Sequence, residues 1–133
     1  MGFDLSAFDE GKKKQEEGIP VPIKHPATGE ETGIVITVAS YESERVKAVA
    51  REIANRALAD QKKNSRKVDT VEAIEDRTFA IALASIVGWS GLEKDGKELP
   101  FTRDNARMIL EAYPFIAEQI DAAAQDRALF FGN

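Results

Sequence analysis

The N-terminal third of the chain alternates between apolar and polar positions. Three aliphatic residues alternate with prolines and polar residues, and a β-branched run follows them: Ile19, Val21 and Ile23, then Ile34 to Val38. Proline cannot donate a hydrogen bond to a sheet ladder, so we expect the first segment to be an edge strand. The β-branched run is typical of a half-buried strand. The pattern predicts a β-hairpin over about 19–38, preceded by a flexible N-terminal arm over 1–18.

Downstream of the hairpin, apolar residues recur at helical spacing. The first stripe lies within a helix expected over about 42–65 and contains Val46, Val49, Ala50, Ile53, Ala54, Ala57 and Leu58. A second helix is expected over about 70–88. The end of this helix falls in residues 79–89, a run that would be apolar on all sides of a helix. Such a run is typical of a buried helix.

Two further helices are predicted from capping residues. Thr102 can cap a helix over about 102–112, and Pro114 suits the first turn of a helix over 114–131. We therefore expect residues 19–133 to form a single helical domain. Its fold class is mostly α with an N-terminal β-hairpin (α+β), with about four helices.

Composition narrows the function classes. The chain of 133 residues is 43% hydrophobic and 31% charged, which is typical of a globular domain. Its net charge of -5 falls mainly in the C-terminal half, which argues against a phosphate-binding surface there. With no cysteine, disulfides and thiol catalysis are excluded. No apolar run reaches the roughly 18 residues of a membrane span, so we expect no membrane partner.

Few residues could carry catalysis or hold a metal. His25 is the only histidine, so no site can use two imidazoles. Glu72, Glu75 and Asp76 share one helix face and could bind a metal, but their attraction to the positive helix N-terminus explains them equally well. Since no phosphate-binding loop is present either, we expect no enzyme activity, no cofactor and no metal.

A basic cluster ends the first predicted helix, at Lys62, Lys63, Arg66 and Lys67. Nucleic-acid binding would use such residues together with aromatic side chains that stack on bases. No aromatic residue lies among them. We interpret the cluster as a solvated helix end and expect no nucleic-acid partner.

The C-terminal segment is unusually apolar. Leu129, Phe130 and Phe131 are followed only by Gly132 and Asn133. Such a tail either packs into the core or forms a contact surface for a partner or a second copy, because exposed apolar clusters are costly unless covered. The sequence alone leaves both interpretations open.

A tryptophan and a turn motif follow the apolar run. The segments are Gly88-Trp89-Ser90-Gly91, Asp95-Gly96-Lys97-Glu98-Leu99-Pro100-Phe101-Thr102 and Tyr113-Pro114-Phe115-Ile116. They resemble the tail assembly chaperones of long-tailed, siphovirus-type bacteriophages. In that family a buried helix ends in a tryptophan and leads to a turn with the pattern D-G-x-x-hydrophobic-P-F-(S/T), then a short helix and a Y-P step. Residues 26–30 are also similar, so the resemblance extends from about Gly18 to the end.

The resemblance implies a role in virion morphogenesis. Such chaperones self-associate and coat the tape measure protein, keeping it soluble until tail tube subunits polymerise around it. A longer form, often made by ribosomal frameshifting, is thought to recruit the tail tube protein. The implied location is the host cytoplasm, with absence from the mature virion.

For this role we expect residues that form contact surfaces, and no active site. Trp89, Leu92 and Phe101 would organise the turn, and the C-terminal segment would form a contact tail of Leu129, Phe130 and Phe131. Two alternatives share the same sequence features. One is a small helical adaptor or regulatory protein that binds a protein partner, and the other is a structural virion connector protein.

Overall fold

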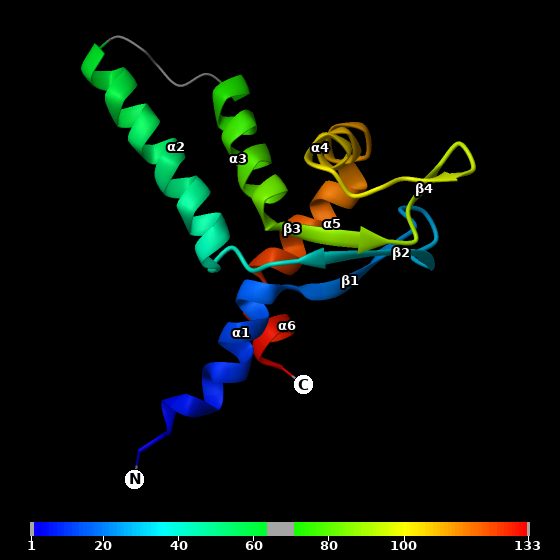
Figure 1. Cartoon of the computed structure of the whole chain (residues 1–133), viewed down its shortest axis with the longest axis horizontal. Coiled ribbons are helices and arrows are strands. Elements are labelled where there is room, and N and C mark those ends of the chain that lie inside the picture. The colour runs from blue at the N-terminus through cyan, green and yellow to red at the C-terminus, as the bar shows by residue number, and fades with distance from the viewer. Residues whose placement is uncertain (1, 64–70, 133) are drawn as a thin grey trace.

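A three-stranded antiparallel sheet of order β1-β2-β3 lies at the centre of the molecule (Figure 1). The structure is a computed structural model that describes residues 2–63 and 71–132, apart from the side chains of 60–63 and 71–74. β1 (Ile19–Lys24) pairs with β2 (Glu31–Val38), which confirms the predicted hairpin. β3 (Ile86–Ser90) pairs with the other side of β2.

This third strand corrects the predicted fold class. A mostly α domain of about four helices with a lone hairpin is wrong, because the described residues form two sheets and six α-helices. The fold is still α+β. The error lies in the apolar run over 79–89, which fits a buried helix and a buried strand equally well. Here α3 (Val71–Ser85) ends within that run, and the chain continues directly as β3.

Ser85 marks the change from helix to strand. Its hydroxyl donates to the carbonyl of Ala82 at 2.6 Å. Its carbonyl accepts from the N–H of Ala39 at 2.7 Å, at the end of β2. Beyond it, a β-branched pair, a glycine and Trp89 continue in the extended conformation. The strand therefore begins where backbone groups can pair with β2.

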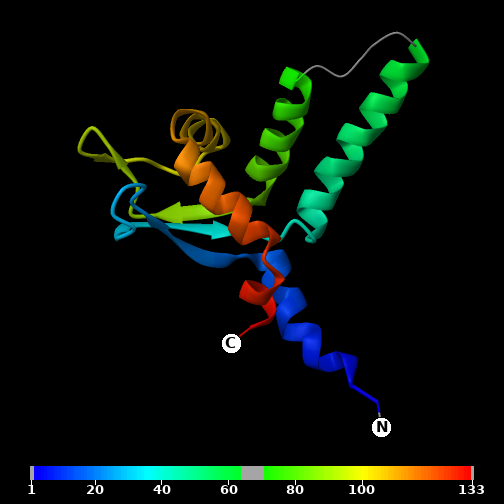
Figure 2. The same ribbon diagram turned by 180° about the vertical axis from the view of Figure 1, so that it is seen from behind.

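The helices occupy two places around the sheet. α2 (Glu44–Lys63) and α3 run side by side and project away from it, as both views show (Figures 1 and 2). α4 (Arg103–Ala112) and α5 (Pro114–Gln125) contact each other, and α5 lies against β1 and β2. The Thr102 hydroxyl accepts from the N–H of Asn105 at 3.0 Å and Pro114 opens α5, so both predicted helix starts are confirmed.

The core lies between the sheet and α3 to α5. Its buried members alternate along the strands and recur at helical spacing on the helices: Ile23, Ile36, Val38, Ala82, Ile86, Leu92, Ala106, Ile109, Leu110, Ile116, Ile120 and Ala124. Burial of this aliphatic surface is the main force that holds the helices on the sheet.

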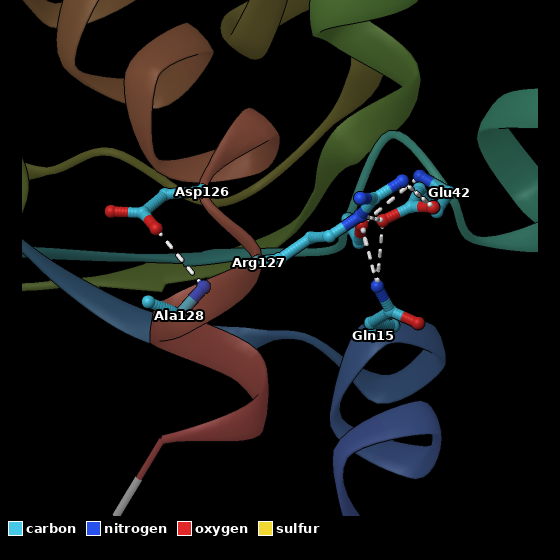
Figure 3. A network of polar contacts seen from close by, with 6 residues as sticks. Gln15, Glu42, Asp126, Arg127 and Ala128 are labelled. Atoms are coloured by element: carbon cyan, nitrogen blue, oxygen red, sulfur yellow. Dashed lines mark hydrogen bonds and ion pairs between the residues drawn. The ribbon is translucent and has the colours of Figure 1, made fainter. Parts of the chain in front are cut away.

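A helix near the N-terminus and the last helix of the chain lie side by side below the sheet (Figure 1). Where the sequence suggested a flexible arm, the chain forms a short 3-10 helix, η1 (Leu5–Phe8), and then α1 (Asp9–Glu17). The last predicted helix is divided into α5 and α6 (Arg127–Phe131), and α6 packs against α1. Asp126 sits at this break and its carboxylate accepts from the N–H of Ala128 at 3.0 Å (Figure 3).

Candidate partner-binding surfaces

The residues selected from the sequence fall into two separate regions. Trp89, Leu92 and Phe101 surround the small hairpin of β4 (Glu93–Lys94) and β5 (Lys97–Glu98). The C-terminal residues lie on α6, at the other side of the sheet in both views (Figures 1 and 2). The structure therefore separates the turn residues from the contact tail.

The turn cluster is held by specific contacts. The indole N–H of Trp89 donates to the carbonyl of Leu99 at 2.8 Å. The Trp89 and Phe101 rings meet edge to face, with centroids 5.0 Å apart. Leu92 is buried, while Phe101 stays exposed on one side. At the tip, Asp95 and Gly96 both adopt positive φ, as a tight two-residue turn requires. These residues fix the conformation of the turn.

The three residues of the C-terminal segment have different environments. Phe130 is 1% exposed and belongs to the interior. Leu129 and Phe131 are 48% and 39% exposed. The segment is thus neither wholly core nor wholly surface, because the short helix α6 turns one aromatic ring inward and its two neighbours outward.

Sequence reasoning missed the apolar side chains at the N-terminus. Phe3 and Leu5 are 70% and 73% exposed, and Phe8 is also exposed. The Phe3 and Phe8 rings stack with centroids 5.2 Å apart, and Phe8 meets Phe131 edge to face at 5.9 Å. The three-residue spacing of Leu5 and Phe8, which places them on one helical face, was the available signal. We call the combined surface the terminal patch: Phe3, Leu5, Phe8, Leu129 and Phe131.

Gly11 allows α1 and α6 to approach closely. A Cβ at this position would overlap the ring of Phe131. The absence of a side chain at Gly11 therefore lets the ring of Phe131 lie directly against the backbone of α1. This contact brings the N-terminal and C-terminal parts of the terminal patch together.

A polar network fixes α1 and α6 to the loop between β2 and α2 (Figure 3). The buried Gln15 donates to Glu42 Oε1 at 3.2 Å and to the hydroxyl of Ser40 at 3.4 Å. Arg127 donates through Nε and Nη2 to the two oxygens of Glu42, at 2.6 and 2.9 Å. These bonds from Arg127 are the main reason that the pKa of Glu42 lies below its ordinary value.

The structure describes only some of the candidates for catalysis, metal binding or nucleic-acid binding. His25 Nδ1 accepts from the N–H of Ala27 at 3.1 Å, which supports the turn between β1 and β2. Glu75 and Asp76 are exposed, while the side chain of Glu72 lies outside the described residues. The side chains of the basic cluster, Lys62, Lys63, Arg66 and Lys67, also lie outside them.

The described part of the chain contains neither a group of metal-binding side chains nor a helix that could span a membrane. Within it, no three His, Cys, Asp or Glu residues are grouped so that they could hold a metal ion. Among the helices it contains, none combines the length and the apolar character needed to cross a membrane.

Comparison with known proteins gives one family. No curated protein and no solved structure matches the chain significantly. A family model described as YdaY prophage protein matches residues 41–131, which is more than half of the chain. The matched segment begins in the loop after β2 and includes all of α2 to α6, so it contains both the turn cluster and the contact tail. The chain is phage-derived and belongs to the YdaY prophage protein family.

Proposed function

We propose that this prophage protein is a tail assembly chaperone, which self-associates and coats the tape measure protein until the tail tube polymerises. The terminal patch is the observation that carries the proposal. It exposes five large apolar side chains on one end of the molecule, and three of its aromatic rings contact one another in series. Exposed apolar clusters of this kind mark protein-binding surfaces.

The physical properties of the patch suit an elongated apolar client. A soluble chaperone must offer apolar surface to its client and keep a charged exterior elsewhere. Here the patch lies on η1, the residues just before it and α6, while the neighbouring helix α1 exposes many charged side chains. The similarity of the Trp89 turn to phage tail chaperones and the phage origin of the family support the same role.

The proposal includes several further properties of such chaperones. A longer, frameshifted form would recruit the tail tube protein. The protein would act in the host cytoplasm, without a cofactor, nucleic acid or membrane, and would not catalyse a reaction. Mass spectrometry of all products of the native gene tests the longer form. A single product would remove that part of the proposal.

Coexpression with the tape measure protein of the same prophage tests the client interaction. We expect this chain to raise the soluble fraction of the tape measure protein, and Leu129→Ser to reduce that gain. Leu58→Ser is the matched control, because Leu58 is an exposed leucine on α2, 58% accessible and outside the patch. Equal solubility with both variants, or no gain with the unmodified chain, would contradict the proposal.

Mass spectrometry of purified particles separates the chaperone from a structural connector. A chaperone is expected in infected or induced cells and absent from finished virions. Stoichiometric recovery of the chain from purified virions would favour the connector instead. A soluble complex with a partner unrelated to tail assembly would favour the adaptor.

A further inference from the structure

A groove lies between the base of α2, the end of α3 and the start of α4. Its volume is about 330 Å³, near the lower end of the range for ligand sites, about 300 to 1,000 Å³. Its floor is apolar, and it is formed by Val49, Leu83, Ala84, Val87 and Phe101. Two arginines, Arg45 and Arg103, also line it. The groove therefore suits an apolar segment that carries negative charge.

The two arginines have no acidic partner in the part of the chain that the structure describes. The ion pairs found there involve other arginines and Lys13. Both Arg45 and Arg103 are exposed. Their charge is available to a partner, and an acidic group placed against them would gain from complementary electrostatics.

The N-terminal segment has the complementary chemistry. Phe3 and Leu5 are the most exposed large apolar side chains in the described residues. Asp4, Asp9 and Glu10 lie among and after them, and no basic residue occurs between position 2 and Lys12. Residues 3–10 thus combine apolar side chains with three negative charges.

We propose that residues 3–10 of one copy of this chain dock into the groove of a second copy. Docking within a single chain is prevented by the position of α1. Its backbone and side chain at Gln15 bond to Ser40 and Glu42, and Gly11 packs against α6. The helix then directs the N-terminus away from the sheet, while α2, α3 and α4 lie on the far side of it (Figures 1 and 2).

This contact joins two different surfaces, so each copy has one segment and one groove to offer. Such heterologous contacts build rings when the rotation closes and open helical assemblies when it does not. The docking contact would account for the self-association that is part of the proposed function, and the inference rests on the proposed function in that one respect. It can be measured in the absence of any tape measure protein.

Light scattering during size-exclusion chromatography of the untagged full chain tests the docking. We expect a mass that rises with concentration for the unmodified chain. Arg45→Glu with Arg103→Glu, the groove variant, should weaken association roughly tenfold or more, because like charges would then meet. Arg45→Lys with Arg103→Lys keeps the charge and should associate nearly normally. Both glutamates would lie in first helical turns, where acidic residues are favourable, so the fold should be retained.

A mixing experiment distinguishes this contact from a symmetric one. Phe3→Ser with Leu5→Ser, the segment variant, keeps its groove, whereas the groove variant keeps its segment. At a concentration where the unmodified chain has just assembled, each variant alone should be mainly monomeric, and an equimolar mixture should form a dimer that does not grow further. A mixture that stays monomeric, a groove variant that associates like the unmodified chain, or an unmodified chain that is monomeric throughout would overturn the proposal. The Leu129→Ser solubility test involves other residues, so each proposal can fail separately.

Discussion

The turn cluster around Trp89 and the terminal patch are both rich in aromatic residues, but their surroundings differ. Trp89 has a hydrogen-bond partner in Leu99 and packs against the core that includes the buried Leu92. The rings of Phe3, Phe8 and Phe131 contact one another and remain exposed. Trp89 therefore stabilises a conformation, whereas the terminal patch and the exposed ring of Phe101 are available for a partner. Aromatic content alone does not separate these roles, whereas the polar partner and the half-buried ring of Trp89 do.

The same contrast exists within α6, between Phe130 and Leu129. Phe130 is among the largest fully buried side chains, while its neighbour Leu129 is half exposed. Replacing Phe130 with alanine should destabilise the fold by about 3 to 5 kcal/mol, because a large cavity remains. Leu129→Ala should cost less than about 1 kcal/mol, as expected for a surface site. Chemical denaturation measures both values, and equal losses would contradict the division of α6 into core and surface.

Substitution of Trp89 is expected to give the next largest loss of stability. Its ring is half-buried, so Trp89→Ala should cost about 2 to 3 kcal/mol, somewhat less than a fully buried aromatic ring. Trp89→Phe keeps most of the packing but removes the N–H that bonds Leu99, and should cost about 1 kcal/mol. Thermal unfolding followed by circular dichroism gives both differences. If the two variants were equally stable, the hydrogen bond rather than the packing would account for the role of Trp89.

Gly11 allows a test of the contact between α1 and α6. Gly11→Ala should destabilise the protein by about 1 kcal/mol, because overlap with Phe131 outweighs the better helix propensity of alanine. In a Phe131→Ala background the overlap is absent, so the same change should stabilise by up to about 1 kcal/mol. A double-mutant cycle measured by urea unfolding detects this change of sign. If the sign did not change, α6 would not pack on α1 as described.

The smallest expected effect concerns the ion pair of Glu42 and Arg127. Since the folded-state pKa of Glu42 is lowered, its contribution is fully present above the ordinary glutamate pKa and is lost as the pH falls through the lowered value. The Arg127 side chain is largely exposed and that of Glu42 is partly exposed, so we expect a local change rather than global unfolding. The Nε–H signal of Arg127 should shift in that acidic window by NMR. In Glu42→Gln the shift should disappear, and its persistence would assign it to another carboxylate.

Local sequence patterns predicted those elements that depend on neighbouring residues. The 19–38 hairpin and the starts of α4 and α5 follow from alternation, a capping hydroxyl and a proline. These signals act within a few residues of the chain, so a single sequence is enough to find them.

Elements that depend on distant partners could not be predicted in the same way. Residues 86–90 form a strand because the edge of β2 is available to them. Residues 9–17 become a packed helix through contacts with Ser40, Glu42 and Phe131. The terminal patch requires both chain ends at one place, which only the tertiary fold provides. The tail was recognised as important, but its inward and outward residues could not be distinguished.

Isolation of the protein's complexes from cells that produce the phage tests the central claim most directly. The proposed role predicts many copies of this chain bound to each tape measure protein before tail assembly, and none in purified virions. Leu129→Ser should lower the number of bound copies, while Leu58→Ser should leave it unchanged. Recovery of the chain without tape measure protein, or within finished virions, would contradict the account.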